Sequence, residues 1–381
     1  TVRLWDINTE TPRFTLRGHR DWVLCTAWSP NGRMIATGGK DGTLFVWDAV
    51  LGKAAGPGLA GHRKWVTAVS WEPMHANARC DLLASASKDL LVKIWNWRTG
   101  RCLYQLSGHT ASVTCLRWGG EGLIYSGSQD RTIKVWVACE GKLARSLEGH
   151  GHWVNCLATN TDHALRTGCY DHRGRDLAAR DEGAPAQVVS GRKRKVAQAD
   201  DGGADEGGAE VDEAGLDARR AKAHERYLEL RGESAPSEVL ASASDDLTAF
   251  LWHPACSKKP ICRLQGHQRP INALCFAPDG RTLATASFDG SVRLWQGADG
   301  KFICTLRGHV GPVYQVGWSG DSRLVVSGSR DSTMKVWELR TRKLKTDLPG
   351  HADEVFAVDW SPDGQRVASG GKDKMLKFWR A

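Results

Sequence analysis

The sequence of 381 residues has no apolar run near the roughly 18 residues that a membrane-spanning helix requires, so we expect no membrane partner. None of its 11 cysteines forms a Cys-x-x-Cys pair or a zinc-like cluster, which argues against a zinc site built from cysteines. Several of them (Cys25, Cys115, Cys156 and Cys275) stand inside apolar strand-like patterns, which is typical of buried thiols in a reducing compartment.

Recognisable catalytic motifs are also missing. There is no His-Glu-x-x-His and no Gly-x-Ser-x-Gly. Two Gly-Gly-Lys-Asp stretches, 38–41 and 370–373, lack the upstream glycine and the Ser or Thr after the lysine that a phosphate loop needs. We therefore expect no enzyme activity, no metal ion, no cofactor and no small-molecule substrate. The net charge of +9 permits contact with nucleic acid without proving it.

A repeat runs through the whole sequence. A Gly-His pair recurs seven times, with the histidines His19, His62, His109, His150, His267, His309 and His351. Each pair is followed by a tryptophan, and these are Trp47, Trp95, Trp136, Trp252, Trp295, Trp337 and Trp379. An aspartate stands six residues before each tryptophan, at Asp41, Asp89, Asp130, Asp246, Asp289, Asp331 and Asp373. Four residues earlier comes a hydroxyl residue: Thr37, Ser85, Ser126, Ser242, Thr285, Ser327 or Ser369.

This spacing is the signature of the WD repeat, and it predicts an all-β WD40 β-propeller built of four-stranded blades. In such a blade the indole N–H, the hydroxyl, the imidazole and the carboxylate form one buried hydrogen-bonded chain. A half-satisfied buried network is costly, so each group requires the others. We therefore interpret the repeated histidines and aspartates as structural residues, not as catalytic groups or metal ligands.

The number of blades follows from the first residues. Trp5 fills an eighth tryptophan position that has no Gly-His pair before it, and the stretch 13–16 resembles the outer strand that follows. We expect an eight-bladed propeller over residues 1–381 that is truncated at its N-terminus, with the inner half of the first blade missing. The alternative is a seven-bladed ring in which 13–16 pairs with the last blade and 1–5 is a surplus strand.

One repeat is interrupted by an insertion at 172–237, which carries 12 basic and 14 acidic residues. An acidic Gly/Ala tract within it predicts disorder, and a helix is expected near 216–231. A basic tetrad formed by Arg192, Lys193, Arg194 and Lys195 is a candidate nuclear import signal. Two stretches compete for the second strand of this blade. We favour Leu-Ala-Ser-Ala-Ser over Leu-Arg-Thr-Gly because only the former has its tryptophan at the expected distance.

Recognition residues are predicted at the mouth of the propeller, where the chain enters each inner strand. Trp22, Trp65 and Trp153 each stand three residues after a repeat histidine. The residue before each repeat aspartate faces the same mouth, and most of these are basic or polar: Lys40, Lys88, Gln129, Arg330 and Lys372, with Asp245 and Phe288 completing the set. Basic residues interleaved with aromatics suit RNA or an acidic protein partner. The simpler interpretation is that they only pad the blade tops and keep the surface soluble.

Longer stretches resemble one group of WD-repeat proteins, the Notchless family of large-subunit ribosome assembly factors. They include LAGHRKWVTAVSWEPMHAN, GHTASVTCLRWGGEGLIYSGSQDRTIKVW and DLPGHADEVFAVDWSPDGQRVASGGKDK. The resemblance implies a non-catalytic scaffold of the nucleolus and nucleoplasm that binds pre-60S particles, with the propeller touching ribosomal RNA and assembly proteins. It also implies coupling to the AAA ATPase midasin through an N-terminal ubiquitin-like domain, which we expect to be absent from this sequence.

Two other functions remain open from the sequence. A WD-repeat propeller also suits an adaptor in signalling, to which the link of the family name with the Notch pathway points. A substrate receptor of a ubiquitin ligase is the other possibility. Sedimentation separates them, because a ribosome assembly factor migrates with pre-60S particles and an adaptor does not.

Overall fold

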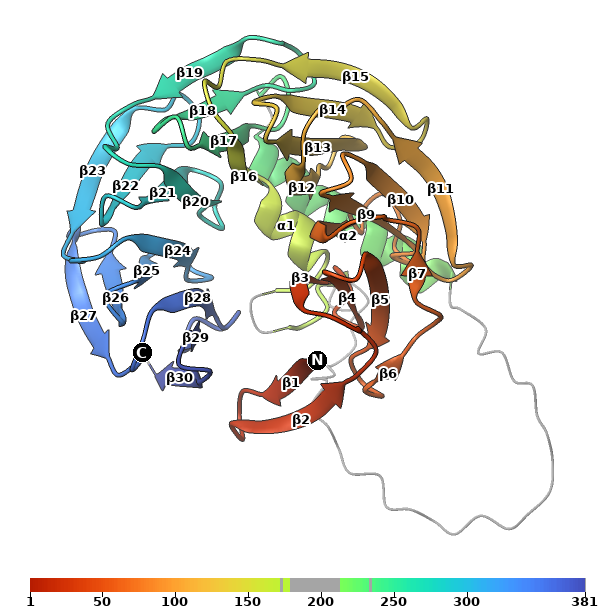
Figure 1. Ribbon diagram of the computed structural model, residues 1–381, viewed down its shortest axis with the longest axis horizontal. Helices are drawn as coiled ribbons and strands as arrows, with labels where there is room; N and C mark the ends of the chain where they lie inside the picture. Colours follow the sequence, from red (N-terminus) through yellow and green to blue (C-terminus); the bar gives the residue numbers. More distant parts are fainter. Residues whose placement is uncertain (172–173, 179–212, 233–234, 381) are drawn as a thin grey trace.

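The computed structural model describes residues 1–171, 174–178, 213–232 and 235–380. Its antiparallel sheets are arranged around one axis as the blades of a propeller, which confirms the predicted WD40 fold (Figure 1). The acidic tract and the basic tetrad Arg192–Lys195 lie outside the described residues.

The first half of the ring contains four sheets. Blade 1 has only two strands, β1 (Val2–Asp6) and β2 (Thr11–Leu16). Blade 2 contains β3 (Val23–Trp28), β4 (Met34–Gly39) and β5 (Thr43–Asp48), with the short β6 (Lys53–Ala54) and β7 (Leu59–Ala60) along β5. Blade 3 is β8 (Val66–Trp71), β9 (Leu82–Ser87), β10 (Val92–Asn96) and β11 (Arg101–Leu106). Blade 4 is β12 (Val113–Trp118), β13 (Leu123–Ser128), β14 (Ile133–Val137) and β15 (Lys142–Leu147).

The second half follows the same order. Blade 5 is β16 (Val154–Thr159), β17 (Leu240–Ser244), β18 (Ala249–Trp252) and β19 (Pro260–Leu264). Blade 6 is β20 (Ile271–Phe276), β21 (Thr282–Ser287), β22 (Ser291–Gln296) and β23 (Phe302–Arg307). Blade 7 is β24 (Val313–Trp318), β25 (Leu324–Ser329), β26 (Thr333–Glu338) and β27 (Lys343–Pro349). Blade 8 has three strands, β28 (Val355–Trp360), β29 (Arg366–Gly371) and β30 (Leu376–Arg380).

Alternation of side chains along each strand explains why the blades stack. Residues of the inner and middle strands on one face of a sheet pack against the next sheet, so the core consists of apolar clusters between neighbouring blades. One cluster joins Leu294 of blade 6 to Val316 of blade 7. The outer strands keep exposed residues because one side of each faces solvent.

Blade 1 lies between the last blade and blade 2 (Figure 1). The ring of Trp5 meets that of Phe378 in blade 8 edge-on, with 6.3 Å between the centroids. On its other side, Leu16 packs with Ile35 and Trp47 of blade 2. Strand β2 pairs with β1 and not with β30, so the seven-bladed alternative, in which 13–16 closes the last blade, is wrong.

In the described residues, blade 1 consists of β1 and β2 and offers no inner strand to its neighbour. The effect is seen at a tryptophan that recurs at the end of the inner strands. Trp71, Trp118, Trp318 and Trp360 are at most 8% exposed, but Trp28 of β3 is 54% exposed. The indoles of Trp71 and Trp318 each donate a hydrogen bond to a backbone carbonyl of the preceding inner strand, at 3.0 Å. Trp28 has no such neighbour within blade 1.

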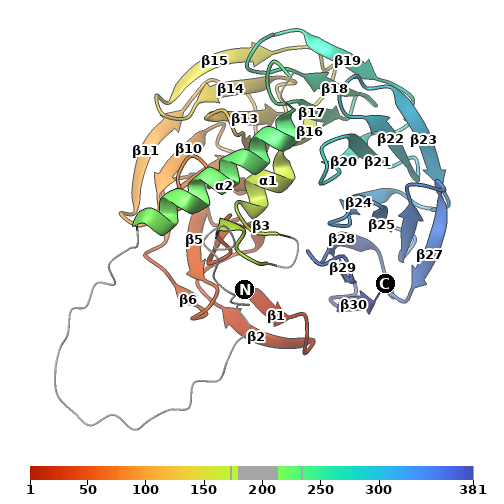
Figure 2. The same ribbon diagram turned by 180° about the vertical axis from the view of Figure 1, so that it is seen from behind.

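The segment between β16 and β17 begins earlier than the insertion expected at 172–237, and its two helices, α1 (Asp162–Thr167) and α2 (Glu213–Arg231), lie together on one face of the ring (Figure 2). The helix expected near 216–231 falls within α2. Strand β17 comes from Leu-Ala-Ser-Ala-Ser and pairs with β16, whereas the competing Leu-Arg-Thr stretch ends α1. The ring of Tyr227 stacks on His75 of blade 3 at 4.7 Å, and Arg231 lies 3.7 Å from Glu121 of blade 4. Helix α2 therefore links neighbouring blades.

Candidate binding surface on the mouth face

The four repeated side chains form one hydrogen-bonded chain in each of blades 2 to 8. The tryptophan Nε1–H donates to the hydroxyl oxygen over 2.8–3.0 Å. That hydroxyl lies 2.8–2.9 Å from the histidine Nε2. The histidine Nδ1 lies 2.7–3.2 Å from the aspartate carboxylate. The interrupted repeat is included, through His150, Ser242, Asp246 and Trp252.

This geometry sets the charge states of the chain. A carboxylate beside Nδ1 requires a proton there, which leaves Nε2 to accept from the hydroxyl. Burial lowers the pKa of His62, so it favours the neutral ring. Burial alone would raise the pKa of Asp331, but hydrogen bonds from His309 and Thr333 outweigh it and hold that pKa well below its usual value. The pKa values of the equivalent aspartates are lowered as well.

The same carboxylates fix the loops that carry the predicted recognition residues. Each repeat aspartate also accepts the backbone N–H of the residue after its histidine, at 2.8–3.1 Å; the donors are Arg20, Arg63, Thr110, Gly151, Gln268, Val310 and Ala352. These loops lie before the inner strands. Because neighbouring strands run antiparallel, they share one face of the ring, here called the mouth face, with the loops between the second and third strands. Helices α1 and α2 lie between an inner strand and the second strand of blade 5 in the sequence, on the opposite face of the ring.

Backbone hydrogen bonds bring the two predicted sets of mouth residues together in every blade from 2 to 8. In blades 2 and 3, Lys40 N–H donates to the carbonyl of Trp22 at 2.7 Å and Lys88 N–H to that of Trp65 at 2.9 Å. In the other blades the equivalent backbone N–H groups donate in the same way: Gln129 to Ser112, Asp245 to Trp153, Phe288 to Pro270, Arg330 to Pro312 and Lys372 to Glu354. The loops are therefore held in place in the unbound protein.

Four of the predicted residues form a continuous ladder on blades 2 and 3. The ammonium of Lys40 lies 4.8 Å from the centre of the Trp22 ring and 5.1 Å from that of Trp65. The ammonium of Lys88 lies 3.8 Å from the same Trp65 ring. A cation over the face of an indole is attracted electrostatically by the ring, which contributes about 0.5–1 kcal/mol at exposed sites. We call Trp22, Lys40, Trp65 and Lys88 the mouth ladder.

The other predicted mouth residues do not join the ladder. Arg330 lies 3.3 Å from Glu354, and Lys372 lies 3.5 Å from Asp353, so acidic neighbours neutralise this side. Trp153 stands beside His152, whose Nδ1 is 3.6 Å from Asp245. Gln129 is held only through its backbone N–H among the contacts of the described residues.

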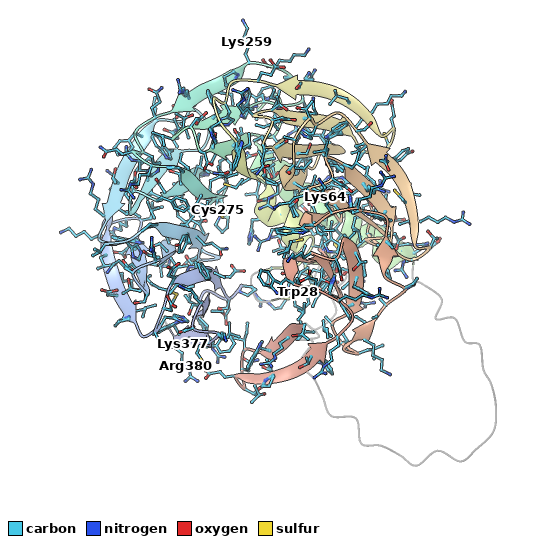
Figure 3. All side chains as sticks on the ribbon, in the orientation of Figure 1. Trp28, Lys64, Lys259, Cys275, Lys377 and Arg380 are labelled. Carbon is cyan, nitrogen blue, oxygen red and sulfur yellow. The ribbon has the colours of Figure 1, made fainter. Side chains whose placement is uncertain are left out.

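Sequence reasoning missed three cations next to the ladder. Arg20, Arg63 and Lys64 are exposed on the loops that carry Trp22 and Trp65, and Figure 3 labels Lys64. Asp21 is the one acidic residue on the same two loops, and its carboxylate lies 3.7 Å from Lys40. The signal was present as the runs His-Arg-Asp-Trp and His-Arg-Lys-Trp. These cations stand out only once the structure shows that Glu354 and Asp353 pair with Arg330 and Lys372 on the other side of the mouth.

Three further features of the part of the chain that the structure describes concern metal ions, membranes and cysteine thiols. No group of three or more His, Cys, Asp or Glu side chains within it is arranged to hold a metal ion. No helix among the described residues is long and apolar enough to cross a membrane. Burial raises the pKa of the Cys25 and Cys80 thiols to about 12, so neither is a ready nucleophile.

Comparison with known proteins agrees with this geometry. The model of the WD domain, G-beta repeat, matches seven segments: 10–48, 57–96, 100–137, 141–175, 258–296, 300–338 and 342–380. The fourth match runs on to residue 175, although β17 supplies the second strand of that blade.

Individual relatives are more specific. The chain is 48% identical over 305 residues to Ribosome assembly protein 4 of Saccharomyces cerevisiae, covering 79% of this chain and 52% of the relative. It is 50% identical over 302 residues to the Notchless protein homolog of Arabidopsis thaliana, covering 79% and 56%. Protein Notchless of Drosophila melanogaster is 47% identical over 281 residues, covering 73% and 50%. The chain thus spans about half the length of these relatives, and it belongs to the Notchless group of the WD-repeat family.

Proposed function

We propose that this chain is a non-catalytic scaffold of ribosome assembly that binds pre-60S particles of the large subunit. The observation that carries the proposal is the 48% identity to a yeast protein named Ribosome assembly protein 4 over 79% of the chain. Identity of 48% over 305 residues is more than the four network residues of each repeat can supply. A surface of preformed loops, with no metal-binding cluster among the described residues, suits a scaffold better than an enzyme.

The mouth ladder is the part of the propeller that we assign to the particle. Its two lysines lie beside three further exposed cations, Arg20, Arg63 and Lys64, and the loops that carry Trp22 and Trp65 hold one acidic residue, Asp21, near Lys40. Arg330 and Lys372, in contrast, lie beside two acidic residues, Asp353 and Glu354. Coupling to the ATPase midasin is a further part of the proposal for the full-length protein, and it rests on the family resemblance alone. A nucleolar and nucleoplasmic location is proposed on the same ground, with Arg192–Lys195 as the import signal.

Sedimentation tests the proposal. An epitope-tagged form of the full-length protein from the same source should migrate through a sucrose gradient with precursors of the large subunit. Its position should shift to the top of the gradient when the particles are dissociated with high salt. A protein found only in the soluble fractions would contradict the proposal and favour the signalling adaptor or the ubiquitin-ligase receptor.

A further inference from the structure

We propose that the mouth ladder binds an unpaired strand of RNA, with one base stacked on Trp22 and the backbone phosphates held by Lys40 and Lys88. The proposal deepens the proposed function, since it names the chemistry by which this face would hold the particle. Three observations carry it: the exposure of the indoles, the position of the ammonium groups, and the local imbalance of charge.

The exposure of the indoles divides the two tryptophans by role. Trp22 is 71% exposed and contacts one ammonium, so most of its ring surface remains open to a stacking partner. Trp65 is 37% exposed and has two ammonium groups over it. Trp65 therefore holds the two lysines in place, and Trp22 is the platform.

The ammonium groups are fixed where a backbone running past Trp22 would need them. Lysine side chains lose about 2 kcal/mol of rotamer freedom when ordered, which weakens binding by flexible lysines. Here the contacts with the rings order Lys40 and Lys88 before any ligand arrives. A strand that stacks one base on Trp22 can therefore place its phosphates along the ladder from blade 2 to blade 3.

The charge imbalance is greatest on blades 2 and 3. Arg20, Arg63 and Lys64 add three exposed cations on the two loops that hold the indoles, against Asp21 alone. On the opposite side of the mouth, Glu354 lies near both Arg330 and Lys372. A short polyanion is thus directed to the ladder and not around the whole ring.

An unpaired strand can use both the open ring of Trp22 and the cations of the ladder. A nucleic-acid duplex or an acidic peptide can use only the cations. A duplex keeps its bases stacked on one another and offers no base face to Trp22. An acidic peptide would engage the lysines but would leave the Trp22 ring in water. Stacking together with phosphate contact is the mode by which proteins bind single strands without sequence preference.

The experiment uses the purified chain and a fluorescent, unstructured RNA of about 12 nucleotides, a length typical of single-strand sites. Binding is followed by fluorescence anisotropy between about 50 and 200 mM KCl. Competitors are the duplex of the same sequence and an oligo-glutamate peptide of the same charge. We expect the single strand to bind tightest and its affinity to fall with salt.

Two variants separate stacking from charge. Trp22→Ala should weaken binding about tenfold with little change in the salt slope, and Trp22→Phe should restore most of it, because stacking does not depend on ions. The double variant Lys40→Gln/Lys88→Gln should reduce the slope of log affinity against log salt by roughly 1.4, at about 0.7 per phosphate of a single strand. Trp28→Ala, an exposed tryptophan at the opposite end of β3, and Lys142→Gln on β15 are the matched controls and should bind like the wild type.

Several outcomes would overturn the inference. Wild-type affinity in Trp22→Ala would remove the platform, and equal binding of the duplex or of oligo-glutamate would show a plain cationic surface. Failure of the purified chain to bind RNA, with normal sedimentation on pre-60S particles, would refute the inference and leave the proposed function standing. RNA binding without sedimentation on pre-60S particles would support the inference and contradict the proposed function.

Discussion

The Asp331 carboxylate lies 2.9 Å from Nδ1 of His309, and both side chains are nearly buried beside the loop that precedes β24. Replacing Asp331 with alanine would leave the imidazole N–H without its acceptor and the backbone N–H of Val310 unbound. We expect Asp331→Ala to cost roughly 1–3 kcal/mol of unfolding free energy. Chemical denaturation measures this, with the surface variant Asp299→Ala as control. Equal midpoints for the two variants would place Asp331 outside any structural network.

The repeat aspartates also predict how stability depends on pH. Their pKa values in the folded protein are lowered from the usual 3.8, so the unfolded chain binds protons more readily. Their contribution is therefore complete above the unfolded pKa and is lost as the pH falls below about 4. Unfolding free energy measured from pH 6 downward should decline steeply in this range. Asp331→Asn should show a shallower decline, and an unchanged slope would contradict the linkage.

Glu238 should give the opposite dependence of unfolding free energy on pH, in a higher pH range. Its carboxyl accepts hydrogen bonds from Tyr125, from Thr161 at 2.9 Å and from the N–H of Gly120 at 3.1 Å, yet burial raises its pKa to about 7. The folded state thus binds this proton more tightly than the unfolded state, and stability falls as the pH rises from about 4.5 to 7. Relative to Glu238→Gln, the wild type should lose roughly 2–4 kcal/mol between pH 5 and 8. Melting curves that keep the same separation at both pH values would contradict this.

Helix α2 depends on a close contact with blade 4. A Cβ added at Gly120 would clash with the ring of Tyr227, which itself stacks on His75. Gly120→Ala should therefore loosen α2 and increase proteolytic cleavage within 213–231, with little effect on the blades. Gly370→Ala is the control, because a Cβ there meets nothing within 4 Å. Equal cleavage in the two variants would show that α2 does not rely on this contact.

The two kinds of inner-strand tryptophan should differ in their effect on stability. Trp318 is 7% exposed and donates to the carbonyl of Cys275, so Trp318→Ala should cost about 3–5 kcal/mol. Trp28, at the same position of β3, is 54% exposed, so Trp28→Ala should cost less than about 1 kcal/mol. Thermal unfolding of the two variants compares them directly. Similar losses would mean that Trp28 is covered in solution.

Much of the fold could be predicted because the repeat network leaves few alternatives. A buried indole, hydroxyl, imidazole and carboxylate must meet, and strands of fixed rise place them at fixed distances along the chain. This is why the spacing to Trp252 selected β17 over the competing stretch that became part of α1. It is also why Trp5 marked a blade with no Gly-His pair of its own.

The candidate site was less predictable, because its properties depend on pairs of residues from different loops. Lys40, Lys88, Arg330 and Lys372 occupy equivalent positions in the sequence, and nothing local distinguishes them. Only the folded ring brings Lys40 of blade 2 over Trp65 of blade 3, while it sets Glu354 against Arg330. The sequence by itself determined the blades, through spacing along single strands. The tertiary structure decided which cations stay available to a ligand. The reason is that the Coulomb energy between two charges weakens with their separation, and only the fold sets how far each cation lies from an acidic side chain.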